Sequence, residues 1–398
     1  MKLIKTGAAL ALTAGTLSAQ GVFEVSPNDG VTESIPLEFS VFANVGWDDN
    51  VTPTTIYEGD ESMYTNFGVG ANYVNITPQT TVDVNLKLGM IYYFDAPEDP
   101  SADDTYYSVR LPFSIVHRVS ERLRFATRNY VFYGLEPDYN YGAVNDRSNE
   151  EYFYISTDNS IGYKWTERLG TYTGFQWNTL DYDGDDSRND RDNFVLYNQF
   201  RYVISQQTIG TLDYRYRMTD VTDGRDSDNQ KLLLGVEHRF SETAVLIARA
   251  GVQYREVDGR DSQTDPTFEL EYRNAVNESF RVRASAAYEI NDYGTSLFGG
   301  ASFENNQVLR FNLAGDYYVS PDLYLTGGVN YINNDYYGGG VPEDTVDVFN
   351  MYIGATYEIT HNLSGNINYN FTTSNDDTGA LNRDYDRNRV QGGLTYTF

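Results

Sequence analysis

The sequence predicts an all-β chain that closes into a transmembrane antiparallel up-and-down β-barrel of about 18 strands. Three observations support this fold class. Runs of about ten residues alternate between apolar and polar side chains along most of the chain. Short turns and long acidic loops alternate between these runs. The last run closes on an aromatic residue, Phe398.

The alternation is clearest in residues 82–90, 280–289 and 363–371, where apolar and polar side chains occupy opposite positions. Because successive side chains of a strand point to opposite faces, this period of two indicates strands whose faces meet different solvents. The mean hydropathy of -0.51 agrees with this interpretation. A spanning strand exposes only every second residue to lipid, so half of its positions can be polar.

The spacing of the short turns gives the strand count. Their centres lie near residues 78, 120, 166, 205, 241, 278, 320 and 360. Eight turns that join nine hairpins give eighteen strands, with 16 or 20 as alternatives. Residues 291–306 contain an apolar stretch, 296–301, that could form a nineteenth strand. An odd number would reverse the C-terminal strand, so we expect a folded outer loop there.

The N-terminal residues predict export from the cytoplasm. Lys2 and Lys5 precede an apolar stretch, and Ala19 offers a small residue for cleavage, so residues 1–19 read as a signal peptide. Residues 20–35 are expected to form a short periplasmic segment, and residues 36–398 a single barrel. The chain has no cysteine, which excludes disulfides, thiolate nucleophiles and cysteine metal sites.

A closed barrel of this size predicts a water-filled lumen. Unpaired backbone groups are costly in hydrocarbon, so the first and last strands must meet. Eighteen strands leave a lumen too wide for side chains alone to fill. Only an inward-folded loop could narrow or block it, since the sequence provides no further domain. Tyr and Phe clusters near the strand ends, at 92–94, 130–133, 152–154 and 317–318, are expected to form interfacial girdles.

The net charge of -28 is concentrated in the loops. More than half of the 57 acids lie in nine segments: 48–62, 94–105, 135–150, 183–192, 219–229, 257–266, 291–306, 334–346 and 374–386. Three explanations of this acidity stay open. Acidic residues favour exposed turns, divalent cations can bridge loop carboxylates, and an acidic pore mouth can attract cations. Structural Ca²⁺ or Mg²⁺ has only weak candidate ligands, Asp181, Asp183 and Asp185; no other cofactor is expected.

A second set of charges is expected to face the lumen, because charged side chains on the lipid face would cost roughly 2–4 kcal/mol each. By strand alternation this set comprises Arg215, Arg217, Arg249, Arg255, Arg281, Arg283, Arg310, Asp213, Glu237, Glu269 and Glu271, with Asp316 beside them. Opposed rows of such charges could create a transverse field at a constriction. Equally, they could keep a polar lumen wet and link its strands together.

Catalytic chemistry is not indicated. The chain has three histidines, His117, His238 and His361, all at or beside predicted short turns. Glycine-rich segments such as Gly338–Gly340 lie in loops without a following helix, so they predict no phosphate site. A basic surface for nucleic acid is also missing. We therefore expect neither an enzyme nor a nucleic-acid-binding protein.

Two segments resemble known proteins. Leu394, Tyr396 and Phe398 resemble the terminal strand by which bacterial outer-membrane barrels are recognised by their assembly machinery. Phe39–Val51 resembles the opening of a group of outer-membrane β-barrel porins, some of which are linked to exopolysaccharide export loci. The resemblance implies a place in the outer membrane, among lipid and lipopolysaccharide, but it transfers no functional residue.

The function expected from the sequence is passive diffusion of small hydrophilic solutes or ions through the lumen. A barrel for exopolysaccharide export or surface attachment, without an open pore, is the alternative. Association into a homotrimer stays open.

Overall fold

A computed structural model describes residues 34–53, 60–95, 102–139, 144, 150–183, 190–222, 225–260, 262–291, 303, 305–338, 343–377 and 384–398. The predicted signal peptide and nearly all of segment 20–35 lie outside these residues. So does the apolar stretch 296–301 that raised the question of a nineteenth strand.

The described residues form eighteen β-strands. They are β1 (Ile35–Asp48), β2 (Ser62–Ile76), β3 (Thr80–Tyr93), β4 (Thr105–Arg118), β5 (Leu123–Gly134), β6 (Tyr152–Lys164), β7 (Leu169–Tyr182), β8 (Arg191–Val203), β9 (Thr208–Val221), β10 (Ser227–Arg239), β11 (Ala244–Val257), β12 (Gln263–Ala275), β13 (Phe280–Asn291), β14 (Asn305–Tyr318), β15 (Leu323–Tyr337), β16 (Asp344–Thr360), β17 (Leu363–Asp376) and β18 (Tyr385–Thr397).

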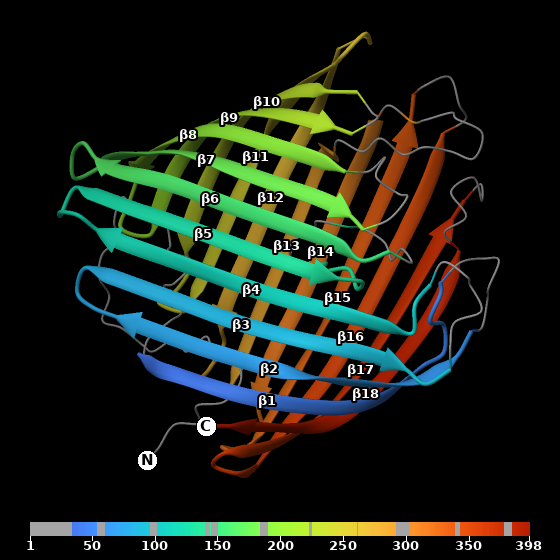
Figure 1. Cartoon of the computed structure of the whole chain (residues 1–398). Helices are drawn as coiled ribbons and strands as arrows, with labels where there is room; N and C mark the ends of the chain where they lie inside the picture. The colour runs from blue at the N-terminus through green and yellow to red at the C-terminus, as the bar shows by residue number, and fades with distance from the viewer. Residues whose placement is uncertain are drawn as a thin grey trace.

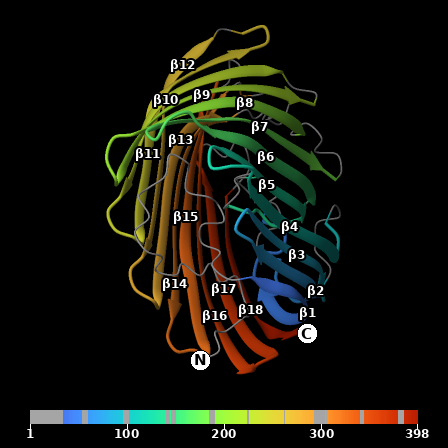
Figure 2. The ribbon, with the colours of Figure 1, turned by 90° about the vertical axis from the view of Figure 1, so that its left-hand side faces the viewer.

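These strands close into one antiparallel barrel (Figure 1). Each strand pairs with its neighbours in the chain, and β1 also pairs with β18, from Ser40↔Thr397 to Asp48↔Arg389. This seam removes the two free sheet edges that hydrocarbon would not tolerate. The predicted fold class and the count of eighteen strands are confirmed. Figure 2 shows two walls of the barrel, β4–β8 and β14–β18, facing each other across the interior.

Short turns gather at one end of the barrel and long connections at the other; we call these the turn end and the loop end. The turns share a local cause. In six of them a Ser, Thr or Asn side chain accepts a hydrogen bond from the backbone N–H three residues later, which closes the turn. The donors are Thr80, Leu123, Leu169, Ala244, Phe280 and Leu323, at 2.8–3.1 Å from Thr77, Ser120, Thr166, Ser241, Asn277 and Ser320.

The strands run further toward the loop end than the sequence predicted. Segment 334–346 was expected to be a loop, but β15 and β16 continue to pair up to Tyr336↔Asp344. Polar side chains on these two strands link across the extension: Thr345 donates to Asp335 at 3.0 Å, and Asn333 donates to Asp347 at 3.0 Å. Polar composition suggested a loop, whereas cross-strand hydrogen bonds keep these residues in the sheet.

The two faces of the barrel differ in chemistry, as the period of two predicts. Large apolar side chains are exposed on one face, for example Leu234 at 69%, Ile367 at 58% and Leu37 at 56%. We call this the outer face. The opposite positions form the inner face and carry most of the charged and amide side chains. In the part of the chain that the structure describes, no helix is long and apolar enough to cross a membrane.

The expected aromatic girdles are only partly correct. Tyr317 is 46% exposed, but Tyr93, Tyr130 and Tyr152 are nearly fully buried in clusters on the inner face. The reason is the strand period itself: within a run of consecutive aromatic residues, neighbours must point to opposite faces. Such a run therefore supplies rings to both the outer face and the interior.

Gly68 on β2 allows a close approach of neighbouring strands. A Cβ built there would lie 2.0 Å from the carbonyl oxygen of Leu88 and 2.7 Å from the Phe42 ring. We expect Gly68→Ala to destabilise the barrel by about 1–3 kcal/mol through overpacking. The measurement is the temperature at which the compact folded band on an unheated gel is lost. Gly392→Ala is the control, since its Cβ would meet nothing closer than 3.4 Å; an equal shift in both variants would contradict the prediction.

Candidate functional site: the inner face and the loop that crosses it

An ionic cluster lies on the inner face at the seam of the barrel. Arg387 and Arg389 project from β18, two residues apart and therefore on the same face. Arg387 donates to both carboxylate oxygens of Asp48 on β1, at 3.0 and 2.6 Å. Arg389 Nε lies 3.1 Å from Asp48 Oδ2. The Asp48 and Arg387 side chains are 0% and 5% exposed, so these charges hold the seam in a buried setting.

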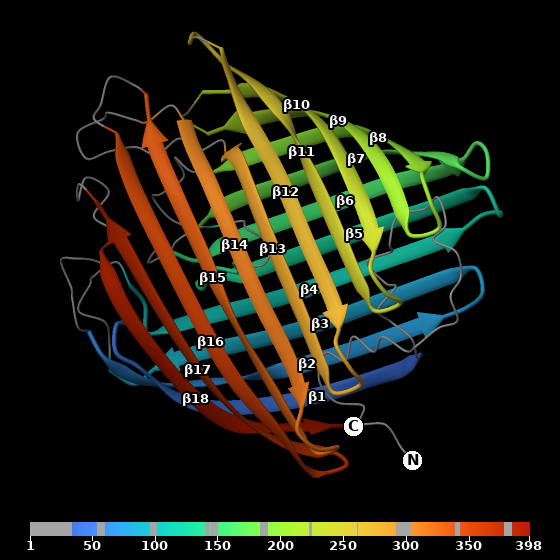
Figure 3. The same cartoon turned by 180° about the vertical axis from the view of Figure 1, so that it is seen from behind.

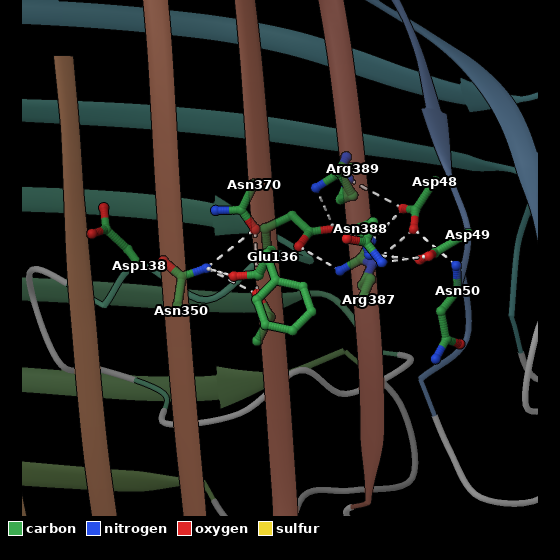
Figure 4. Close-up of polar contacts among 12 residues, drawn as sticks. Asp48, Asp49, Asn50, Glu136, Asp138, Asn350, Asn370, Arg387, Asn388 and Arg389 are labelled. Atoms are coloured by element: carbon green, nitrogen blue, oxygen red, sulfur yellow. Dashed lines mark hydrogen bonds and ion pairs between the residues drawn. The ribbon is translucent and has the colours of Figure 1, made fainter.

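Glu136, from the loop after β5, completes this cluster. Its carboxylate accepts bonds from Arg387 at 2.9 and 3.0 Å, and it lies 3.0 Å from Arg389 Nη1 (Figure 4). Four strands separate β5 from β18 around the barrel, so the loop must leave its own hairpin to reach this place. Charge-assisted bonds of this kind are about twice as strong as neutral ones, which makes Glu136 an anchor for the loop.

The described part of this loop, Leu135–Tyr139, reaches two walls of the barrel. Leu135 packs with Tyr64, Tyr93 and Tyr106 of β2–β4. Tyr139 packs against the apolar cluster of β14–β16, which includes Ile332 and Val346. The loop therefore lies inside the barrel near the loop end.

Two further contacts fix the same loop on the β4–β6 side. Asp138 pairs with Arg110 at 2.9 Å and accepts a bond from the Tyr130 hydroxyl at 2.5 Å. Val144 returns to the inner face near Tyr152 and Leu180. A segment held against both walls narrows the passage through the barrel at this level.

At mid-length the inner face of β15–β17 carries amides instead of charges. Asn330 donates to Asn350 at 3.0 Å, and Asn350 donates to Asn370 at 3.1 Å and to Thr372 at 2.9 Å. Figure 4 shows Asn350 and Asn370 beside Glu136, so the amide row and the ionic cluster border the same passage. An amide presents both donors and acceptors, and it suits neutral hydroxylated solutes as well as water.

The eleven charges expected to face the lumen alternate along β9–β14 with the apolar residues of the outer face, as on β9, where Leu212 and Tyr214 flank Asp213. Many pair along the wall. Arg215 lies 2.6 Å from Glu269, which also accepts from Arg249 at 3.3 Å. Arg249 lies 3.6 Å from Asp213, and Arg217 lies 3.8 Å from Glu289.

The remaining members of the set are placed as follows. Glu237 pairs with Arg201 at 2.6 Å, Glu271 with Arg273 at 2.5 Å, and Arg283 with Asp316 at 3.0 Å; Arg255 donates to Asn305, Arg281 lies 5.9 Å from the Tyr318 ring, and Arg310 is on β14. Apart from Glu271 and Arg273, which are both on β12, these contacts link different strands, in line with the second reading of the charges. That these side chains contact a solute inside the barrel stays a prediction.

Some residues of the interior were missed by the sequence analysis. Arg387 and Arg389 share the alternation of the last strand with Val390 and Leu394, and that signal could have found them. Lys231, which bonds to Glu289, could have been found in the same way. Glu136 could not, because no periodicity predicts where a loop carboxylate folds.

The three residues proposed as the assembly signal lie on the outer face of β18. Leu394, Tyr396 and Phe398 are 50%, 43% and 68% exposed, and the rings of Tyr396 and Phe398 meet edge to face at 5.0 Å. The backbone N–H of Phe398 donates to the carbonyl of Phe39 at 2.8 Å. Their recognition by an assembly machinery stays a prediction.

Of the candidate cation ligands, Asp181 is exposed on β7, Asp183 has another contact, and Asp185 lies outside the described residues. Asp183 accepts a bond from the Tyr133 hydroxyl at 3.1 Å, and the same hydroxyl lies 3.0 Å from Glu151. Burial raises the pKa of Glu151, and Asp183 adds to the effect. Within the described residues, no group of three His, Asp or Glu side chains could hold a metal ion, so structural Ca²⁺ or Mg²⁺ stays a prediction.

The histidines occupy the turn end, as expected from the sequence. His117 and His238 each share a hydrogen bond with a threonine on the adjacent strand, Thr80 at 2.8 Å and Thr208 at 2.9 Å. His361 lies in the turn between β16 and β17. These contacts fix the strand ends in place.

Comparison with known proteins gives matches in structure only. Neither the protein-family models nor the curated proteins match the chain. Crystal structures with a similar fold include OccAB4 of Acinetobacter baumannii, at 11% identity and a TM-score of 0.47, covering 94% of this chain and 100% of that one. A BenF-like porin from Pseudomonas fluorescens Pf-5 has 14% identity and a TM-score of 0.47, with 91% and 98% covered.

A third similar structure is OccK2 (OpdF) of Pseudomonas aeruginosa in complex with glucuronate, at 11% identity and a TM-score of 0.45, with 91% and 98% covered. Similarity at this level transfers no residue roles, so the function is argued below from the barrel itself. These three structures give no support to the resemblance to barrels linked to exopolysaccharide export.

Proposed function

We propose that the chain is an outer-membrane pore through which small hydrophilic solutes or ions diffuse passively. One observation carries the proposal: several charged side chains point into the barrel and yet are open to water. The side chains of Arg110, Arg128 and Arg283 are 44%, 43% and 48% exposed, although they lie on the inner face. This exposure inside the barrel supports a water-filled interior.

The outer face supports the location in a membrane that this proposal requires. Its exposed apolar side chains match a lipid environment, and closure through the seam of β1 and β18 satisfies the backbone there. We place the barrel in contact with outer-membrane lipid and lipopolysaccharide, with the loop end outward. The loop after β5 then forms the narrow part of the passage. We propose no catalytic role for the chain.

Single-channel recording of the refolded mature chain in a planar bilayer tests this function. Stable current steps are expected from protein that first shows the heat-dependent gel shift of a folded barrel. Folded barrel without any conductance would overturn the open pore and favour a closed barrel instead.

The pore should prefer cations at low salt. The inner face pairs most of its described arginines with carboxylates, whereas the loop segments hold a large excess of acids. The preference should weaken between 0.1 M and 1 M salt, where the screening length falls from about 10 Å to about 3 Å. The reversal potential across a salt gradient measures it. Asp103→Asn, Asp258→Asn and Asp377→Asn together should reduce it, because these carboxylates are exposed at the loop end.

The matched control removes three exposed charges from the turn end, through Glu121→Gln, Glu242→Gln and Glu278→Gln. A preference for anions in the unmodified protein would show that the inner arginines dominate. Equal effects of the two triple variants would show that the acidic loop end has no special role.

A further inference from the structure

A patch of small polar side chains interrupts the apolar outer face on β5–β8. Its members occupy the same strand positions as exposed apolar residues: Phe125, Ile161, Phe175 and Leu196 are 37%, 54%, 41% and 47% exposed. We call it the polar patch. It consists of Thr127 and Asn129 on β5, Thr157 and Asn159 on β6, Thr173 on β7 and Asn198 on β8.

The polar patch lies on four strands that are side by side in Figure 1. Between β6 and β7 its residues are diagonal neighbours, since Asn159 pairs directly with Phe175 and Thr173 with Ile161. Three of its contacts are direct cross-strand pairs: Thr127↔Asn159, Asn129↔Thr157 and Thr173↔Asn198. Its side chains also bond to one another. Asn129 donates to Thr127 at 2.8 Å and accepts from Thr157 at 2.6 Å; Asn159 donates to Thr157 at 2.8 Å, and Asn198 to Thr173 at 2.5 Å.

Elsewhere the middle of the outer face is apolar. Figure 3 shows the opposite side of the barrel, which includes β13 and β16. By the strand alternation these two strands, like β1 and β3, carry only apolar residues at the outer positions of their mid-length. The corresponding residues are Val41, Ala43 and Val45, Leu86 and Leu88, Ala284 and Ala286, and Met351 and Ile353. Lipid hydrocarbon offers no hydrogen-bond partners, so the polar patch does not match the lipid around the rest of the outer face.

Lipid cannot satisfy the groups that remain in the patch. Each amide has two N–H donors and a carbonyl oxygen with two lone pairs. The hydrogen bonds among the described residues use one N–H of each asparagine, so the second N–H of each amide makes no bond within the patch. In hydrocarbon such groups require a protein partner, because no water is available.

We infer that the polar patch is the contact surface for a second copy of this chain, in a two-fold dimer whose axis runs along the membrane normal. The inference rests on the proposed function, since it requires a barrel in lipid. The patch is uncharged and carries donors and acceptors together, so it is complementary to itself. Amide hydrogen bonds between transmembrane helices contribute to their association in lipid, and the same chemistry is available to the amides of this patch.

Symmetry selects two copies over three. Copies inserted in the same direction are related by rotation about the membrane normal, and a two-fold axis brings the same patch of each copy together. A three-fold ring would place the patch against a different surface of the next copy. The outer faces of β1, β3, β13 and β16 are apolar at that depth and would leave the amides unpaired. A homotrimer built on this patch is therefore disfavoured.

Cysteine cross-linking tests the contact, because the chain has no cysteine of its own. Thr173→Cys places a thiol in the patch at an exposed position, and Ala286→Cys places one on the outer face of β13. Under oxidation in the native membrane, we expect a disulfide-linked dimer from Thr173→Cys and none from Ala286→Cys. No dimer, equal dimer from both variants, or linkage to a different protein would overturn the inference.

Removal of the polar groups gives the second test. Asn129→Leu with Asn159→Leu should convert the dimer to monomer in native mass spectrometry from lipid nanodiscs, while Ala284→Leu with Ala286→Leu should leave it intact. Current steps per barrel should persist in both variants. Unmodified protein that conducts but is monomeric would refute the dimer alone, whereas a dimer without conductance would refute the pore alone.

Discussion

Replacement of Glu136 by alanine should widen the pore. The carboxylate makes charge-assisted bonds to Arg387 and Arg389 and holds the loop after β5 inside the barrel. Loss of the bonding to these two arginines, at about 1.5 kcal/mol for each arginine, shifts the balance between released and attached loop on the order of 100-fold. We expect a higher and noisier single-channel conductance, and entry of larger sugars in liposome-swelling measurements.

Glu121→Ala is the matched control for this prediction, because Glu121 is an exposed acid in the turn between β4 and β5. Its conductance should equal that of the unmodified protein. If Glu136→Ala also conducts like the unmodified protein and admits the same sugars, the loop does not set the width of the passage. Tyr139→Ala then tells whether packing against β14–β16 holds the loop without the carboxylate.

Loss of Arg201 should cost more stability than loss of any exposed arginine. Arg201 on β8 bonds to Glu237 on β10 at 2.6 Å and to Gln199 at 2.9 Å, and the two charged side chains are 0% and 1% exposed. Arg201→Met removes the guanidinium that lies 2.6 Å from the buried Glu237 carboxylate, and breaking a buried ion pair by removing one side costs about 3–5 kcal/mol. Denaturant-induced unfolding of the barrel in lipid vesicles measures this loss.

Two further variants make the test specific. Arg201→Met combined with Glu237→Met should recover most of the lost stability, since a buried ion pair replaced as a whole by apolar residues is often neutral. Arg283→Met breaks a pair whose arginine is 48% exposed, and it should cost about 0–1 kcal/mol. A loss of the same size in Arg201→Met and Arg283→Met would show that burial of the pair is not the reason.

The strand number and the face of each strand residue could be predicted from the sequence, because both depend on neighbouring residues in the chain. Turn spacing alone determines the strand number, and the period of two determines which side of the wall each residue occupies. Both rules placed Arg215 and Glu269 on one face before their contact was known. When the same rule is applied to Tyr92 and Tyr93 individually, it places the Tyr93 ring on the inner face, where that ring is found.

The contacts of the narrow passage are not local. Glu136 and Arg387 are 251 residues apart, and their contact depends on the path of a loop whose composition resembles that of the other acidic loops. Strand ends were missed for a related reason. Asp335 reads as a loop residue, but it accepts a hydrogen bond from Thr345 on the neighbouring strand, and this depends on a pairing that composition does not reveal.

The pairing of β1 with β18 also determines which strand pair of the barrel can form last. All other pairings join strands that follow each other directly in the chain, whereas Ser40 and Thr397 meet only after β18 has been synthesised. Contacts between such distant segments form slowly, because a long loop must close first. Until then, β1 and β18 both present unpaired edges. The nascent chain therefore needs protection from aggregation for the whole of its synthesis and transit, and the last strand is the one that ends this need.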